Sequence, residues 1–232
     1  MRYLSSLKAK NLSVLAAGGK MKNSDNIFEV NKHTKDKKQL FIDAAIRSLA
    51  MHGYKGTTVR QIAKYAGVTP GLLTHYYEGK EVLIAESYKY LAKQFLDNFQ
   101  RKIDAQEANP LKTLQLFFRN IFEPDNLGPP FLRVWLAFWT LTLTEPELRN
   151  AHKEIYKQYI ISIEAMLIAA YQQKNISIKG KNTKSLAIGI YALTDGLWLE
   201  CCLDPDAFSQ ENNLEIVYKF VESTTGLSIK SN

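Results

Sequence analysis

The segment from residue 58 to residue 80, TVRQIAKYAGVTPGLLTHYYEGK, constrains the fold of this chain more than any other. Its first part carries small and apolar residues at helical intervals, namely Val59, Ile62, Ala63 and Ala66. Gly67 then allows a left-handed backbone, which ends a helix at little steric cost. Thr69 can cap a second helix, and Pro70 suits its first turn because the missing N–H is not needed there. Two short helices joined by a turn are therefore predicted.

The second short helix is predicted to have an apolar inner side and a polar outer side. Leu72, Leu73 and Tyr76 continue the apolar pattern, while Thr, His, Tyr and Lys side chains fall on the outer side. This arrangement is typical of a helix-turn-helix whose second helix enters the major groove of DNA. The alternative is an ordinary helical hairpin with a solvated polar face. Because caps, glycine placement and periodicity agree, the DNA motif is favoured.

Basic charge is concentrated in the part of the chain that holds this motif. Residues 1–80 contain 14 Lys and Arg against 5 Asp and Glu, whereas residues 81–232 contain 16 against 18. Such a distribution around a helix-turn-helix is the electrostatic footprint of phosphate binding. Double-stranded DNA is therefore the expected partner.

The two cysteines, Cys201 and Cys202, are adjacent, so they form neither a disulfide framework nor a metal-ligand spacing. A reducing, cytoplasmic setting follows. No apolar run reaches the roughly 18 residues needed to span a membrane, so no membrane partner is expected. Residues 1–34 are polar or mildly basic and are predicted to be a disordered leader, with Met21 as an alternative start.

An enzyme and a helical scaffold are the two competing classes. The sequence contains no nucleophile elbow, no phosphate-cradling glycine loop and no HExxH zinc motif. We therefore expect no catalytic residue, no metal and no cofactor. The capped helix-turn-helix in basic surroundings disfavours a scaffold that does not bind DNA.

Beyond the leader the chain is predicted to be helical, without strands. Apart from the helix-turn-helix, helical stripes are expected at residues 40–53, 80–105, 110–121, 131–144, 147–173, 184–203 and 213–225. We predict an all-α fold in which a three-helix DNA-binding domain at residues 35–80 precedes a domain of about six helices at residues 81–232.

Several short motifs resemble the TetR family of transcriptional regulators. They are Gly53-Tyr54, Thr57-Thr58, Ile62-Ala63, Ala66-Gly67-Val68 and Leu73-Thr74-His75-Tyr76-Tyr77, with Lys80 and Leu83. The resemblance covers the chain from about residue 36 onward and is strongest at residues 40–90. It implies a ligand-responsive regulator, most often a repressor, that binds a palindromic operator as a homodimer. Its C-terminal domain would then bind the effector and form the dimer.

The second half of the chain is similar to the BetI-like subgroup of this family. The similarity lies in residues 131–139 (FLRVWLAFW), 146–148 (PEL) and 195–199 (DGLWL). The best-known members of the subgroup repress genes that convert choline to glycine betaine, and they respond to choline. Choline or another quaternary ammonium compound is thus the expected effector, and a multidrug or lipophilic compound is the alternative.

Ten residues are candidates for DNA contact: Thr58, Arg60, Thr69, Gly71, Leu72, Thr74, His75, Tyr76, Tyr77 and Lys80. Those from Thr69 to His75 are expected to approach base edges. The resemblance implies that some of Tyr76, Tyr77 and Lys80 hold phosphates, which fixes register without reading sequence. Packing beneath the motif is the alternative for Tyr76, and a plain surface charge is the alternative for Arg60.

Six residues are candidates for effector binding: Trp135, Phe138, Trp139, Tyr191, Asp195 and Trp198. Tyr191, Asp195 and Trp198 share one helical stripe, which we expect to face the interior of the protomer. Aromatic faces and one carboxylate suit a quaternary ammonium ion through cation–π attraction. The alternatives are that the aromatics are only core, and that Asp195 pairs with a Tyr hydroxyl or an Arg.

A dimer interface is predicted on the last two helices. Gly189, Leu193 and Gly196 form a stripe of mostly small residues where another helix can come close. The final helix offers one apolar face, made of Leu214, Val217, Tyr218 and Val221. Two helices from each subunit would form a four-helix interface around a twofold axis.

Overall fold

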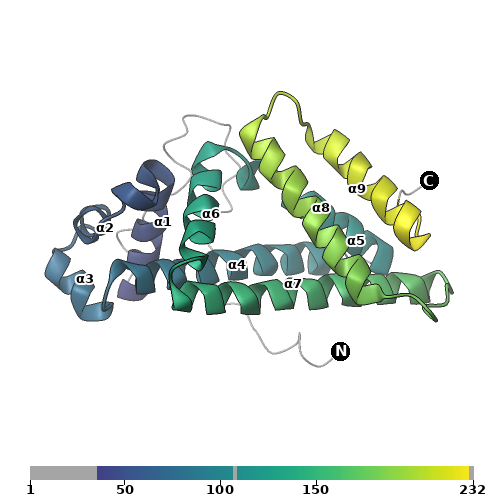
Figure 1. Cartoon of the computed structure of the whole chain (residues 1–232), viewed down its shortest axis with the longest axis horizontal. Helices are drawn as coiled ribbons and strands as arrows, with labels where there is room; N and C mark the ends of the chain where they lie inside the picture. The colour runs from purple at the N-terminus through teal and green to yellow at the C-terminus, as the bar shows by residue number, and fades with distance from the viewer. Residues whose placement is uncertain (1–35, 107–108, 230–232) are drawn as a thin grey trace.

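The all-α prediction is confirmed by a computed structural model that describes residues 36–106 and 109–229 (Figure 1). These residues form nine α-helices and one 3-10 helix, and they contain no strand. The elements are α1 (Lys37–Gly56), α2 (Val59–Ala66), α3 (Pro70–Tyr76), α4 (Lys80–Ala105), α5 (Pro110–Ile121), η1 (Pro124–Asn126), α6 (Pro129–Thr142), α7 (Pro146–Gln173), α8 (Thr183–Leu203) and α9 (Gln210–Thr225). The predicted leader at residues 1–34 lies outside the described residues.

The first three helices begin and end where the sequence provides caps. The Oγ1 atoms of Thr58 and Thr69 accept backbone N–H groups at the starts of α2 and α3. Gly67 ends α2 with a φ of 68°. Gly53 interrupts α1 with a φ of 62° and a ψ of −175°, a conformation that favours glycine. The turn between the two motif helices is therefore the one expected from the sequence.

Helix α4 joins the two ends of the molecule (Figure 1). Its Leu83 packs in the core of α1, α2 and α3, together with Phe41 and Leu73. Ile84, the next residue, and Tyr88 belong to a second apolar cluster, which also contains residues of α1, α6 and α7. The predicted domain boundary at residue 80 remains a prediction, since α1 and α4 contribute to both clusters.

The other end is a bundle in which α5, α7, α8 and α9 enclose the largest apolar cluster. Helices α8 and α9 lie side by side and lean away from α6 (Figure 1). Helix α8 is long and apolar enough to cross a membrane by length and composition alone. In the protomer, 33% of its apolar window is buried. A single helix of this kind is weak evidence for a membrane span, because core helices pass the same test.

The apolar face of α9, which was predicted to form the dimer interface, faces the core of its own protomer instead. Leu214, Val217, Tyr218 and Val221 are at most 9% exposed in the single protomer. They cover the bundle core, where the Tyr218 ring meets that of Phe118 at 6.2 Å. The apolar face of this last helix is needed to close the protomer itself, so these four residues do not form a dimer surface. The side that faces outward carries Ile216 among charged residues, which include the ion pair of Lys219 with Glu215.

Candidate DNA interface and effector pocket

The outer surface of α3 carries most of the predicted DNA-contacting residues. Exposed positions along it and at its start are Thr69, Gly71, Thr74, His75 and Tyr76, and Leu72 is half-buried. Within the described part of the chain, a Cβ at Gly71 would meet nothing within 4 Å, so the backbone there is open to close approach. Leu73 anchors the helix from beneath with no exposure. The polar side of α3 is therefore unobstructed by the protomer.

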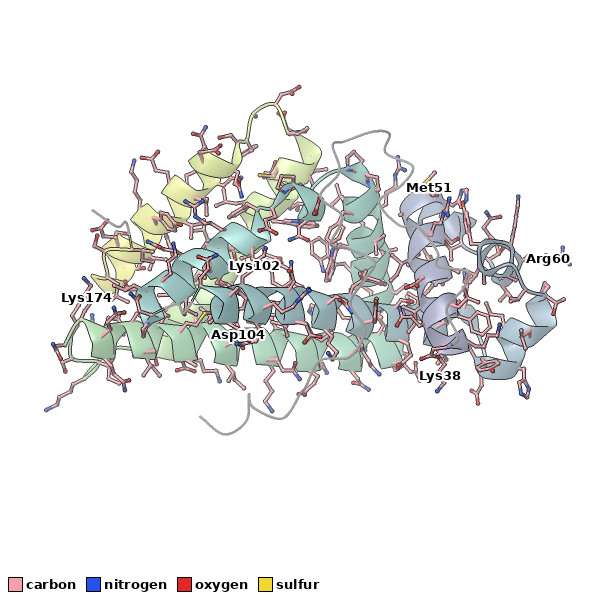
Figure 2. The ribbon with its side chains drawn as sticks, turned by 180° about the vertical axis from the view of Figure 1, so that it is seen from behind. Lys38, Met51, Arg60, Lys102, Asp104 and Lys174 are labelled. Atoms are coloured by element: carbon pink, nitrogen blue, oxygen red, sulfur yellow. The ribbon has the colours of Figure 1, made fainter. Side chains whose placement is uncertain are left out.

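Thr58 and Arg60 lie at the start of α2, beside this surface. Both are exposed, although the Thr58 hydroxyl is already used as the α2 cap. Arg60 extends from the outer end of the molecule, opposite the end that holds Lys174 (Figure 2). The guanidinium of Arg60 is thus open to solvent on the side of the molecule that carries the motif.

Tyr76 and Tyr77, predicted as a pair of phosphate contacts, face in different directions. Tyr76 is 40% exposed and rests its ring against Phe41 at 5.3 Å. Tyr77 is only 7% exposed and lies in the core with Phe41 and Leu83. The backbone becomes extended at Tyr77, which ends α3 and turns this ring inward. We therefore assign Tyr77 to packing and keep Tyr76 as the outward tyrosine.

The Lys80 ammonium is held inside the N-terminal domain. Its Nζ donates to the carbonyl oxygen of Thr57 at 3.0 Å and lies 4.1 Å from the centre of the Tyr54 ring. The Tyr54 hydroxyl in turn donates to Glu81 at 3.2 Å. These contacts fasten the start of α4 to the α1–α2 corner. Lys80 thus positions the motif through contacts within the protomer.

A pocket of about 470 Å³ lies between α6, α7 and α8. It is lined by Trp139, Tyr156, Ile188, Tyr191, Ala192, Asp195, Gly196 and Leu199. This size is in the usual range for small-molecule sites. Three predicted effector residues, Trp139, Tyr191 and Asp195, therefore meet in one pocket. Their carboxylate and aromatic rings come from two different helices.

Asp195 is the electrostatic centre of this pocket. Burial raises the pKa of its carboxyl group to about 6, so the group is mostly ionised at neutral pH. In the described structure it has neither a hydrogen-bond nor an ion-pair partner. Burial lowers the pKa of nearby His152, whose Nδ1 lies 2.9 Å from the Tyr88 hydroxyl. A neutral His152 supplies no balancing charge, which leaves the pocket suited to a cation.

The other three predicted effector residues do not line the pocket and lie behind the residues that do. The Trp135 ring lies 5.6 Å from that of Tyr88 and 6.4 Å from that of Trp198. Phe138 is fully buried. The Trp198 Nε1 donates to the carbonyl oxygen of Asn126 at 2.7 Å. These rings support the lining residues, and Trp139 meets Trp198 at 6.0 Å.

Sequence reasoning missed several lining residues. Tyr156 lies in α7, and its ring is perpendicular to that of Tyr191 at 5.2 Å. Ile188, Ala192 and Leu199 share the face of α8 that carries Asp195, since they stand at helical intervals from it. Extending the Asp195 stripe in both directions would have found the α8 residues, but no signal in the sequence marks Tyr156.

The predicted small stripe of α8 divides between two roles. A Cβ at Gly189 would lie 3.8 Å from Cζ of Phe220, so the close helix there is α9 of the same protomer. Leu193 is half-buried and packs against the same core. Gly196 is exposed, faces open space in the described structure and lines the pocket. Of the predicted stripe, only Gly196 is therefore free to face a partner.

A side-chain hydrogen bond adds to the apolar packing between α6 and the first helix. The Arg133 Nη1 of α6 donates to the carbonyl oxygen of Ala50 in α1 at 3.3 Å. Ala50 lies in the last turn before the break at Gly53, where helix carbonyls lack partners from a continuing helix. Trp135, two residues after Arg133, packs on Tyr88. Helix α6 therefore carries one residue that lines the pocket, Trp139, and another that is bonded to α1, the helix that supports the motif.

An exposed helix-turn-helix joined by a long helix to a domain with a ligand-sized pocket defines a transcriptional regulator of the helix-turn-helix class. Residues 41–86 match the family described as bacterial regulatory proteins, tetR family, and residues 110–226 match the BetI-type transcriptional repressor C-terminal family. The chain belongs to the TetR family and has a BetI-type C-terminal domain, as the sequence motifs predicted. The family consists of transcriptional regulators and not of enzymes.

Similar proteins agree with this assignment over most of the chain. The HTH-type transcriptional regulator BetI of Pectobacterium carotovorum is 27% identical over 191 residues, which is 80% of this chain and 92% of that protein. A transcriptional regulator of Pseudomonas aeruginosa PAO1 has a similar structure, with a TM-score of 0.75 and 29% identity over 87% of this chain and 98% of its own. A regulator of Saccharomonospora viridis, solved with choline, shares the fold at a TM-score of 0.68 and 19% identity, covering 80% of this chain and 95% of its own.

Proposed function

We propose that this protein is a dimeric, ligand-responsive repressor that binds a palindromic operator in the cytoplasm and is released by a small cationic effector. The observation that carries the effector half of this proposal is the unpaired carboxylate of Asp195 in an aromatic pocket. The observation that carries the DNA half is the unobstructed polar side of α3.

The DNA half follows from what each exposed residue can reach. Thr74 and His75 project from the middle of α3 and can approach base edges, while Arg60 can hold a phosphate beside them. One such helix reads only a few base pairs. Two copies related by a twofold axis would read two half-sites about one helical turn apart. Tyr76 would add a hydroxyl contact at the end of the helix.

Selection from random duplexes tests the DNA half. We expect the protein to enrich a palindrome whose half-sites are centred roughly 10 base pairs, or a multiple of that, apart. The substitution Thr74→Glu should abolish enrichment because it places a carboxylate against the groove without touching the core. Thr144→Glu, at an exposed position after α6, is the matched control and should enrich the same palindrome. Equal recovery of all sequences by the native protein would exclude a sequence-specific repressor.

The effector half follows from charge and shape. A buried carboxylate without a partner is unfavourable unless a ligand compensates it. A quaternary ammonium ion cannot donate a conventional hydrogen bond, but it can lie against the faces of Trp139, Tyr156 and Tyr191, each worth about 0.5–2 kcal/mol. The Saccharomonospora viridis regulator with choline bound supports this ligand class.

A lipophilic effector is the second candidate, because the FadR regulator of Bacillus subtilis, solved with stearoyl-CoA, has a related fold at a TM-score of 0.59. Asp195 disfavours an anionic acyl ligand. A thermal-shift series with choline, betaine aldehyde, a lipophilic cation and a fatty acyl-CoA separates the candidates. We expect choline or betaine aldehyde to raise the midpoint most, and a larger shift with the acyl-CoA would replace the cationic proposal.

A further inference from the structure

The start of α1 lies beside the end of α3. Phe41, in the second turn of α1, meets the Tyr76 ring at 5.3 Å and the Tyr77 ring at 6.2 Å. Burial, followed by the charges of Glu86 and Asp36, raises the pKa of the Tyr77 hydroxyl. Asp36, which caps α1, is therefore within electrostatic reach of the end of α3. The chain that precedes α1 thus joins the described fold at the edge of the proposed DNA surface.

This edge of the molecule is basic. Lys37 and Lys38, in the first turn of α1, are exposed, and Lys38 lies at the end of the molecule that holds the motif (Figure 2). The Asp36 side chain is already engaged as the cap of α1, where it accepts the backbone N–H of Lys38 at 2.9 Å. From residue 44 to residue 77 the sequence contains no Asp or Glu. Cationic side chains that precede α1 would therefore find few carboxylates on this part of the protomer.

The sequence that precedes α1 is also basic. Residues 1–35, which lie outside the described residues, contain seven Lys and Arg against two Asp and Glu. The first 20 residues contain no acidic residue and four of the basic ones, namely Arg2, Lys8, Lys10 and Lys20. Basic N-terminal segments are typical of chains that bind nucleic acid.

The attachment point brings this charge within reach of DNA phosphates. A peptide chain spans at most about 3.3–3.6 Å per residue, so Lys20, sixteen residues before Asp36, can lie up to roughly 50 Å from the start of α1. One helical turn of duplex DNA is about 34 Å long. The duplex carries one negative charge for about every 1.7 Å of its axis. With α3 in the groove, the phosphates beside the half-site would be the densest negative charge near the start of α1.

We propose that residues 1–38 act as an N-terminal arm that binds the phosphates of duplex DNA flanking the half-site read by α3, so that each protomer covers more DNA than its helix-turn-helix alone. This inference rests on the proposed function, which supplies the DNA and the position of α3 on it. The arm adds affinity without reading sequence, because phosphate contacts carry no sequence information. Each phosphate that it neutralises releases counterions, so the arm also steepens the salt dependence of binding.

Removal of charge from the arm in the full-length chain tests the inference. The arm variant combines Arg2→Gln, Lys8→Gln, Lys10→Gln and Lys20→Gln. The control variant removes four charges from exposed lysines elsewhere, by Lys112→Gln, Lys174→Gln, Lys179→Gln and Lys184→Gln. It keeps the same net charge as the arm variant, and Lys174 lies at the end of the molecule opposite Lys38 (Figure 2).

Affinity is measured by fluorescence anisotropy with the palindrome that the native protein enriches from random duplexes. We expect the arm variant to bind at least tenfold more weakly than the native protein in about 0.1 M salt, and its slope of log affinity against log salt to fall by about two units or more for the bound dimer. The control variant should match the native protein in both quantities.

A second measurement changes the DNA instead of the protein. One duplex ends at the outer edges of the palindrome, and the other continues for about one helical turn on each side. We expect the native protein to bind the longer duplex at least tenfold more tightly, and the arm variant to bind the two within about threefold. The flanking sequence should not matter, because only its phosphates are contacted.

Sequence preference separates this inference from the proposed function. The arm variant should keep the native ratio of affinities for the palindrome and a scrambled duplex, since it loses only phosphate contacts. An unchanged salt slope, an unchanged effect of the flanks, or an equal loss in the control variant would overturn the arm and leave the repressor proposal intact. A native protein that binds palindrome and scrambled duplex equally would overturn both.

Discussion

Burial of the Asp195 carboxyl group opposes folding when the group is ionised, and we propose that a bound cation offsets this cost. The pKa of this group in the folded protein, about 6, lies above the ordinary value of 3.8. The stability associated with its protonated form is fully present below about pH 4 and is lost as the pH rises through 6. Asp195→Asn should therefore raise the unfolding free energy at pH 7.5, by roughly 1–3 kcal/mol, and change it little at pH 4. Denaturant titration at both pH values measures the difference.

If Asp195 is the counter-ion of the effector, as proposed, its ionisation should strengthen effector binding while it weakens folding. A cation binds the ionised carboxylate, so choline affinity should fall about tenfold between pH 8 and pH 5, and the Asn variant should bind weakly at both. Calorimetry at the two pH values gives the comparison. Affinity that is independent of pH in the native protein would exclude Asp195 as the counter-ion of the ligand.

Arg60 and Lys80 are both basic residues of the motif, but their surroundings predict different salt behaviour. Arg60 is exposed, whereas the Lys80 ammonium is bonded to the Thr57 carbonyl. Arg60→Ala should reduce the slope of log affinity against log salt by about one unit for each protomer bound. Lys80→Ala should weaken binding to every sequence and lower stability by about 1 kcal/mol, with the slope unchanged. A reduced slope for Lys80→Ala would restore the phosphate contact expected from sequence.

At the scale of elements, the contact between α6 and α1 is a candidate route from pocket to motif. Arg133→Met keeps the apolar stem of the side chain and removes the donor to Ala50. We expect effector affinity to be unchanged, while the loss of DNA affinity caused by the effector shrinks by about 0.5–2 kcal/mol of coupling free energy. DNA binding measured with and without saturating choline gives that coupling.

Arg149→Met is the matched control for this element. Its guanidinium donates to the carbonyl oxygens of Thr142 and Leu143 at 2.9 and 2.6 Å, and these lie at the end of α6 within the effector domain. This variant also removes hydrogen bonds from a guanidinium to backbone carbonyl oxygens, but none of them leads to α1. Equal loss of coupling in both variants would show a general loosening of α6 and not a route through Ala50.

At the scale of the whole molecule, the helices could be predicted because local signals mark their ends. Gly53, Gly67, Thr69 and Pro110 stand at the breaks and starts that the structure has. Local sequence signals do not show which surface the apolar face of a helix packs against, because tertiary packing decides it. The apolar face of α9 therefore gave no indication of whether it would cover its own core or a second subunit.

Prediction of the effector pocket was limited in the same way, because tertiary packing decides which side chains line it. That Asp195, Tyr191 and Trp139 line one pocket could be expected, because a carboxylate amid apolar neighbours needs a partner. Trp135 lies one turn before Trp139, and Phe138 is the residue directly before Trp139. Both are also aromatic, and only packing places them behind the residues that line the pocket. Tyr77 differs from Tyr76 by one position, and the change to an extended backbone at the end of α3 decides which ring is buried.

Operator binding by the exposed sides of two α3 helices, one from each protomer, is the property on which the proposed function depends. The most direct measurement is a fluorescence anisotropy titration with the DNA that precedes the gene for this chain, against a scrambled duplex of equal composition. We expect two protomers to bind each palindromic operator, with an affinity at least 1,000-fold above that for the scrambled duplex at physiological salt, and choline to release them. Equal affinity for the two duplexes would contradict the proposed function.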